Sequence, residues 1–196
     1  DVSWRGRLEN LTSRFNLRFR PPAESAPNQY PLEGIARGSV ETTPVPTLRL
    51  QESEFHTPDS RLTAQGILGR QQATLAVQLE TSNFEEWRPL ARFFARPAER
   101  IPLVLRSPLT FSGTIRGPVR HPEVHGRVSI GPFEYREWSW DSLRADVSVG
   151  PEYLEVSSGR LLRGDSTVTL AGAVTLEGWR VARDGPARLT VRLQRT

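Results

Sequence analysis

Histidine and carboxylate side chains are the first residues to weigh for chemistry, because they ligate metals and transfer protons. The chain has three histidines, at positions 56, 121 and 125, and no cysteine. His121 and His125 stand four residues apart, but the sequence around them has the character of a strand and a turn rather than a helix. Without cysteine or a neighbouring pair of carboxylates, the sequence predicts no metal site and no cofactor.

Aspartates are the next candidates, as an acid–base pair. Asp59 and Asp165 occupy the same place in two copies of an internal repeat, so both are predicted to shape turns. The tetrapeptide Arg163-Gly164-Asp165-Ser166 is of integrin-binding type, but its repeat partner is Thr57-Pro58-Asp59-Ser60, which favours a hairpin turn instead. The chain contains no nucleophile elbow, phosphate-binding loop or dinucleotide fingerprint. No catalytic residue is therefore predicted, and we expect the protein not to be an enzyme.

Charge and composition bear on two further functional classes, nucleic-acid binding and membrane insertion. All 26 basic residues are arginine, and the formal net charge is +4. The arginines are spread along the chain and alternate with glutamates, whereas a nucleic-acid binder gathers its basic residues on one patch. No apolar run is long enough to cross a membrane as a helix, and the first residues lack the apolar core of a signal peptide. We therefore expect no nucleic-acid partner, and we expect any membrane anchor to lie outside this segment.

Strict alternation of apolar and polar residues is the main structural signal. It is clear in Ala73-Thr74-Leu75-Ala76-Val77-Gln78-Leu79 and recurs along the chain, with Pro- and Gly-containing turns between the runs. Alternation of this kind predicts antiparallel strands with one apolar face, and we expect a mainly β chain of roughly a dozen or more short strands. The apolar, concave face is predicted to carry Leu62, Leu75, Val77, Phe111, Ile115, Val128, Ile130, Leu143, Val147, Val168, Leu170, Leu189 and Val191.

One segment, residues 83–95, has helical rather than strand periodicity. Phe84, Trp87, Leu90, Ala91 and Phe94 would fall on one face at helical spacing. Ser82 followed three residues later by Glu85 has the pattern of a capping box. The sequence therefore predicts one short amphipathic helix, with its apolar side set against the sheet.

An internal repeat organises the strands. Residues 48–66 align without a gap on residues 154–172, each copy running strand, turn, strand. After a short insertion, the third strand of each copy also aligns: Ala73, Leu75, Val77 and Leu79 match Ala187, Leu189, Val191 and Leu193. Repeats of this kind stack and bury a shared apolar surface. We expect N-terminal strands and a Pro-rich linker over residues 1–29, a first β-repeat with the capping helix over 30–100, and a second β-repeat over 101–196.

Several of these segments together resemble the TamB/AsmA-like family. Residues 109–128 contain G-x-hydrophobic-x-G followed by P-x-hydrophobic-x-G, residues 141–147 match D-x-L-x-A-x-V, and Asp59 and Asp165 each begin D-S-x-hydrophobic-T-x-x-G. The resemblance covers most of residues 30–196. It implies a repetitive, elongated antiparallel sheet curled into an open, apolar-lined trough (a β-taco). It also implies a middle segment of a periplasmic protein anchored in the inner membrane.

For function, the resemblance implies movement of phospholipid between the inner and outer membranes, assembly of outer-membrane proteins, or both. Phospholipid acyl chains would be the ligand, and an outer-membrane BamA-like barrel a possible partner. The alternative is an inert structural or adhesin-like β-rich module whose apolar faces pack dry. A fragment of an outer-membrane barrel is a poorer fit, because the runs lack paired aromatic girdles and regular strand lengths.

Overall fold

The structure is a computed structural model that describes residues 2–5, 12–20, 32–42, 45–69, 71–87 and 102–195. Strands hold 73% of these residues, and the principal sheet is antiparallel and is not closed into a barrel. The prediction of a mainly β, antiparallel chain is confirmed at this level. Among the described residues, no helix is long and apolar enough to cross a membrane.

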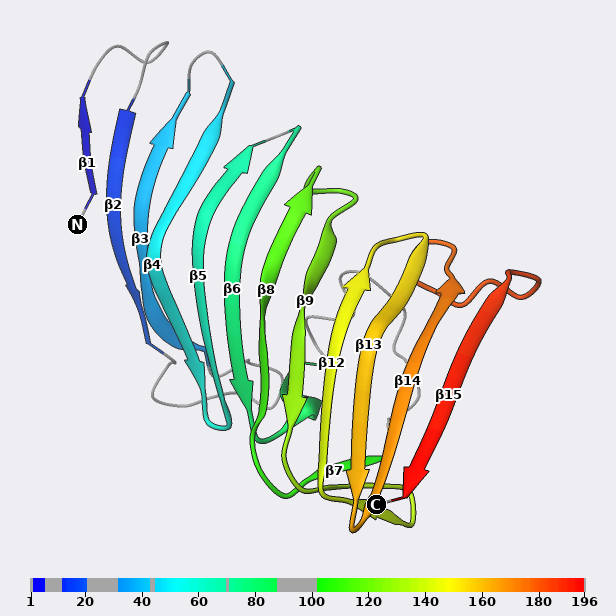
Figure 1. Ribbon diagram of the computed structural model, residues 1–196. Coiled ribbons are helices and arrows are strands. Elements are labelled where there is room, and N and C mark those ends of the chain that lie inside the picture. The colour runs from blue at the N-terminus through cyan, green and yellow to red at the C-terminus, as the bar shows by residue number, and fades with distance from the viewer. Residues whose placement is uncertain are drawn as a thin grey trace. The chain divides into compact units, whose positions relative to one another are not determined.

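The principal sheet has 12 strands, and their order in space is their order in the chain (Figure 1). The strands are β1 (Val2–Arg5), β2 (Thr12–Phe19), β3 (Glu33–Glu41), β4 (Thr47–Thr57), β5 (Ser60–Gly69), β6 (Ala73–Thr81), β8 (Leu109–Gly117), β9 (Glu123–Ile130), β12 (Ser142–Val149), β13 (Tyr153–Arg163), β14 (Ser166–Thr175) and β15 (Ala187–Arg195). A second, three-stranded sheet has the order β11 (Trp138–Trp140), β10 (Phe133–Tyr135) and β7 (Leu103–Leu105).

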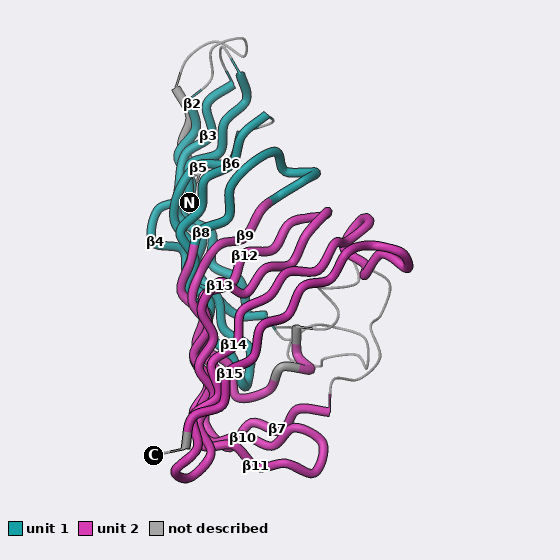
Figure 2. Tube along the Cα trace, turned by 45° about the vertical axis from the view of Figure 1, so that its right-hand side comes forward, with its two compact units in different colours: residues 1–79, 114–122 teal, residues 80–113, 123–196 magenta. Residues whose placement is uncertain are grey.

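The chain forms two compact units, coloured separately in Figure 2. Unit 1 consists of residues 1–79 and 114–122, and unit 2 consists of residues 80–113 and 123–196. These units group residues by contact, whereas the divisions expected from the sequence, at residues 30 and 101, separate repeats. The divisions at 30 and 101 therefore stay predictions.

The internal repeat is present in the strands themselves. β13 begins and ends 106 residues after β4 (47 to 153, 57 to 163), and β14 has the same shift from β5 (60 to 166, 69 to 175). β15 follows β6 by 114 residues at both ends (73 to 187, 81 to 195). The β4–β5 and β13–β14 hairpins turn at Pro58–Asp59 and Gly164–Asp165, so both aspartates occupy turns as predicted.

Both copies also carry a β-bulge at the same point. In β4, Leu50 pairs with Gly66 and Ser53 with Ala64, so two residues of β4 lie opposite one of β5. In β13, Val156 pairs with Gly172 and Gly159 with Leu170, which is the same irregularity shifted by 106 residues. A bulge bends its strand and increases the local twist. The repeat therefore preserves a bend as well as a hydrophobic pattern.

The predicted helix over residues 83–95 is not an α-helix where it is described. Phe84–Trp87 form a single 3₁₀ turn. Its first turn is capped by Asn83 rather than Ser82, because Asn83 Oδ1 accepts a hydrogen bond from the Glu85 N–H at 3.1 Å. Asn83 lies one residue beyond Ser82, where its short amide can reach the N–H two residues on. The remainder of the segment, including Leu90, Ala91 and Phe94, lies outside the described residues.

Unit 2 has a compact apolar cluster at one end of its sheet. Leu109, Ile130 and Phe133 are buried, with exposed fractions of 7%, 5% and 6%. The partly buried side chains packed around them are Leu103, Leu105, Phe111, Val128, Trp140, Leu143 and Leu161. The cluster joins the small sheet to the large one. In Figure 2 the large-sheet strands of unit 2 bend toward the side that carries β7, β10 and β11.

Candidate apolar binding face

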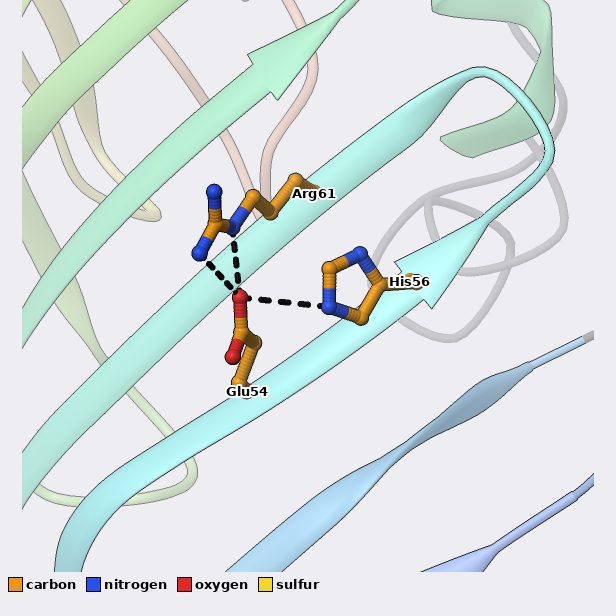
Figure 3. Close-up of polar contacts among 3 residues, drawn as sticks. All are labelled: Glu54, His56 and Arg61. Atoms are coloured by element: carbon orange, nitrogen blue, oxygen red, sulfur yellow. Dashed lines mark hydrogen bonds and ion pairs between the residues drawn. The ribbon is translucent and has the colours of Figure 1, made fainter.

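Two of the three histidines lie beside carboxylates on the surface of the described part of the chain, His56 beside Glu54 and His125 beside Glu123. On β4, Glu54 Oε1 lies 2.5 Å from Nη2 of Arg61 and 3.2 Å from Nε2 of His56 (Figure 3). All three side chains are at least one-third exposed, so the pairs add at most about 1 kcal/mol each. No group of three or more His, Cys, Asp or Glu side chains in the described part of the chain is placed to hold a metal.

The polar face of unit 2 continues this pattern across β9 and β12. Arg127 Nε donates to Asp146 Oδ1 at 2.8 Å, directly across the two strands. This hydrogen bond and the carboxylate charge raise the pKa of the Arg127 guanidinium above its ordinary value. His125 Nδ1 lies 3.0 Å from Ser148 Oγ, also directly opposite. These contacts lie directly across β9 and β12 and support the register of the two strands on the polar side.

Strand register defines the other, apolar face of unit 2, because directly opposed residues of neighbouring strands point to the same side. One such row joins Ile130, Leu143, Leu161, Val168 and Leu193. The rows beside it follow the same pattern. Across β9, β12, β13, β14 and β15 the face also carries Val124, Val128, Ala145, Val147, Val149, Leu154, Val156, Leu170, Val174, Ala187, Leu189 and Val191.

Those residues of the predicted apolar face that belong to unit 2 lie on this side of the sheet. Those in β9, β12, β14 and β15 are placed there by register: Val128, Ile130, Leu143, Val147, Val168, Leu170, Leu189 and Val191. Phe111 of β8 joins them, since it packs against the Leu109–Ile130–Phe133 cluster and a methyl group at Gly126 would lie 2.6 Å from its ring.

The predicted residues of unit 1 are likewise brought to one side of their strands. Leu62 pairs with Phe55, which pairs with Gly34. Leu75 and Val77 are buried, whereas Thr74, Ala76 and Gln78, which alternate with them, are exposed. Thr114 lies on the polar side, where it lines a depression of about 740 Å³ together with Arg37, Gln65 and Thr74. Successive residues of a strand point to opposite faces, so the next residue, Ile115, lies on the apolar side.

Sequence reasoning missed the apolar residues of β13 and β2. Val156 and Leu161 face the same way although they are separated by an odd number of positions, because the bulge between Val156 and Gly159 shifts the alternation by one residue. The sequence does carry a signal for this bulge, because the alternation of Leu154 and Val156 is out of step with that of Gly159 and Leu161. In β2, Phe15, Leu17 and Phe19 alternate and pair with Gly38, Ala36 and Gly34.

The apolar face of unit 2 is partly covered by the small sheet and partly open to solvent. The small sheet covers the end at Ile130, and there Arg163 stacks its guanidinium 4.6 Å from the Trp138 ring. The hairpin of β10 and β11 is thus partly core and partly surface, since the side chain of Phe133 is 6% exposed and that of Trp138 is 55% exposed. On β13 and β15, large apolar side chains face solvent: Leu154, Leu189, Val191 and Leu193 are 37%, 72%, 56% and 70% exposed.

A contiguous run of exposed apolar side chains on a protein surface often marks an interaction site. In unit 2 the apolar side chains of β13 and β15 thus form an exposed surface rather than the lining of an enclosed pocket. Comparison with known proteins adds no family: no protein-family model, curated protein or solved structure matches the chain.

Proposed function

We propose that this chain is a non-enzymatic segment of a bacterial cell-envelope protein, and that the apolar face of its sheet receives the acyl chains of phospholipids. The observation that carries the proposal is the continuity of that face in unit 2. The strands β9, β12, β13, β14 and β15 each contribute apolar side chains to one side, and at β13 and β15 some of these side chains are open to solvent.

The mechanism is passive. Each methylene that moves from water to an apolar surface gains about 0.8 kcal/mol, so a single acyl chain can be held without any hydrogen bond. The polar side, with Arg127 paired to Asp146, stays in water. The bulges in β4 and β13 support a curved sheet, and a trough with the apolar face inside is the finer shape we propose.

The placement in the cell follows from the sequence resemblance to TamB/AsmA-like proteins. On that basis the segment lies in the periplasm, belongs to a protein anchored in the inner membrane, and moves phospholipid toward the outer membrane or assists outer-membrane protein assembly. A BamA-like barrel is the proposed outer-membrane partner.

A dry structural or adhesin-like module is the second candidate, and a specific observation favours it. In unit 1, Ala73, Leu75 and Val77 are only 2%, 9% and 8% exposed, so that part of the apolar face is already filled by protein. A module without ligand would require the open residues of β13 and β15 to be filled as well. The two candidates therefore differ at Leu154, which lies on the apolar face and is 37% exposed.

A lipid-binding measurement on the purified chain separates the candidates. The probe is phosphatidylcholine with a pyrene label on one acyl chain, followed by its fluorescence. We expect binding by the unaltered chain and at least a tenfold weaker affinity for Leu154→Asp, since an acyl chain will not lie against a carboxylate. Thr169→Asp, on the exposed polar side of β14, is the control and should bind as the unaltered chain does. No binding by the unaltered chain, or equal binding by both variants, would refute the proposal.

A further inference from the structure

Arg163 is the last residue of β13, and it lies on the apolar face of unit 2 rather than on the polar side. It stands two positions after Leu161 in a regular stretch of the strand, so the two side chains point the same way. The contact of Arg163 with Trp140 agrees with this placement, because Trp140 and Leu161 pack against the same apolar cluster. Arg127 and Arg160 lie on the opposite, polar side. Arg163 thus sets a positive charge at the end of an apolar surface.

Two indole rings of the small sheet contact the Arg163 guanidinium. Its Cζ lies 4.6 Å from the centre of the Trp138 ring and 5.8 Å from that of Trp140. Both tryptophans belong to β11 and stand two residues apart, so they point to the same side of that strand. Tyr135 of β10 lies directly opposite Trp138, and these two side chains are 41% and 55% exposed. The stack therefore lies where the apolar face meets water, a position that suits the amphipathic rings of Trp and Tyr.

The charge of Arg163 is open to an anionic ligand. Within the part of the chain that the structure describes, Arg163 forms no ion pair with a carboxylate. Asp141 lies across from the end of β13, where its N–H donates to the Leu162 carbonyl, but its Oδ2 accepts a hydrogen bond from the Gly164 N–H at 2.6 Å. Stacking engages the flat face of a guanidinium, whereas its N–H donors lie in the plane and match two oxygens of a phosphate. A cationic ligand does not fit, because a cation already lies on the rings.

The apolar surface that continues from Arg163 is long enough for the acyl chains of a phospholipid. Ser166 of β14 lies opposite Arg163, and Val174 lies eight positions further along the same strand. At ~3.4 Å per residue these eight steps span about 27 Å. Val168, Leu170 and Val174 are half-buried along this path, so part of each side chain is accessible. One leaflet of a bilayer has a hydrocarbon layer of about 15 Å, half of the full core, which fits within this length.

We infer that Arg163, stacked on Trp138 and Trp140, binds the phosphate of a phospholipid whose acyl chains lie along β13 and β14. The inference rests on the proposed function, since it names the headgroup chemistry that the apolar face selects. A diacylglycerol would occupy the same surface without this contact. The site also gives the bound lipid a direction, with its phosphate at the small-sheet end and its acyl chains toward Val174.

Two pyrene-labelled lipids with the same acyl chains test the inference, phosphatidylglycerol and diacylglycerol. We expect the unaltered chain to bind phosphatidylglycerol at least tenfold more tightly, as followed by pyrene fluorescence. Arg163→Gln should lower the affinity for phosphatidylglycerol at least tenfold, because the charged hydrogen bonds to the phosphate are lost, and should leave the affinity for diacylglycerol unchanged. Arg160→Gln, on the polar side of the same strand, is the matched control and should keep the preference for phosphatidylglycerol.

Two further variants probe the chemistry of the site. Arg163→Lys keeps the charge but not the planar set of donors, so it should bind phosphatidylglycerol more weakly than the unaltered chain. Asp141→Asn removes a negative charge beside the site and keeps an oxygen for the Gly164 N–H, so it should tighten phosphatidylglycerol binding.

The outcomes distinguish the inference from the proposed function. Equal affinity of the unaltered chain for the two lipids, or an equal loss in Arg163→Gln and Arg160→Gln, would overturn the inference and leave acyl-chain binding in place. No binding of either lipid would refute the proposed function and the inference with it. Displacement of phosphatidylglycerol by an equal concentration of inorganic phosphate would assign the site to free phosphate and would also overturn the inference.

Discussion

Replacing Ser53 by alanine should destabilise the protein through the backbone of the β4 bulge. Ser53 is fully buried, with 0% of its surface exposed. Its Oγ accepts a hydrogen bond from the Arg37 N–H at 3.2 Å, and it lies 3.3 Å from the carbonyl oxygens of both Arg37 and Gln51. The hydroxyl thus accepts a hydrogen bond from the Arg37 N–H and can donate one to a carbonyl oxygen of Arg37 or Gln51. In Ser53→Ala these backbone groups at the bulge lose that partner.

The magnitude follows from these contacts. Leaving a buried donor or acceptor unsatisfied costs about 1–3 kcal/mol. The bulge borders a depression lined by Arg37 and Ser53, from which water can replace part of the loss, so we expect about 1–2 kcal/mol for Ser53→Ala. Ser53→Gly, which copies Gly159 of the second repeat, should cost a further ~0.5–1 kcal/mol, because glycine is the most flexible residue in the unfolded chain.

Urea unfolding followed by far-ultraviolet circular dichroism measures both losses. Ser158→Ala is the control, since this serine occupies the bulge of the second copy but is exposed, and it should change stability by less than about 0.5 kcal/mol. If Ser53→Ala were as stable as the unaltered protein, or if Ser158→Ala lost as much, the hydroxyl would not be what satisfies the bulge.

Three other variants probe the core, the polar side and the pH response. Phe133→Ala should cost about 3–5 kcal/mol in urea unfolding, since this ring is 6% exposed at the junction of the two sheets, and a loss under ~1 kcal/mol would show that the junction is loose. Arg144→Glu should raise stability by about 0.2–1 kcal/mol, because Arg144 lies directly opposite Arg160, and any loss would contradict that register. Partial burial, aided by the charges of Glu123 and Glu155, raises the pKa of Tyr153 above 10.0, so the folded state holds this proton more tightly than the unfolded state. Stability should therefore be retained below pH 10.0 and fall as the pH rises through the higher folded-state value, and Tyr153→Phe should flatten this decline in a titration of the urea midpoint.

Local patterns in the sequence predicted the strands and their apolar side well. Alternation is a local property of each strand, so Val168 and Leu170 could be assigned to one side without knowledge of their neighbours, and register confirms that they share it. The turn positions of Asp59 and Asp165 followed from the repeat, which requires only comparison of the chain with itself.

Features that depend on distant partners were not predicted. The small sheet pairs Leu103–Leu105 with Phe133–Tyr135, and no local signal announces a pairing across that separation. The burial of Leu75 and the exposure of Leu189 arise from equal patterns, because burial is set by what lies beside and above the strand. Each bulge adds one residue to its strand, β4 or β13, and the alternation reverses beyond that residue. Simple alternation therefore does not place Leu161 on the predicted face.

The helix prediction is wrong for a different reason, because here the local pattern itself is misleading. The spacing of Phe84 and Trp87 gives a helical period, and a capping residue stands before them, but the described turn is 3₁₀ and its cap is Asn83. Periodicity over so few residues does not distinguish a single turn from the start of a longer helix.

Site-specific photo-crosslinking tests most directly whether the apolar face carries acyl chains. A photoreactive amino acid replaces Val168 on the apolar side of β14 or Thr169 on its exposed polar side, and the chain is illuminated with vesicles of phosphatidylethanolamine and phosphatidylglycerol. Mass spectrometry then locates covalent lipid adducts. We expect adducts at position 168 and none at position 169. Adducts at both positions in equal yield, or none at position 168, would contradict the assignment of this face to lipid.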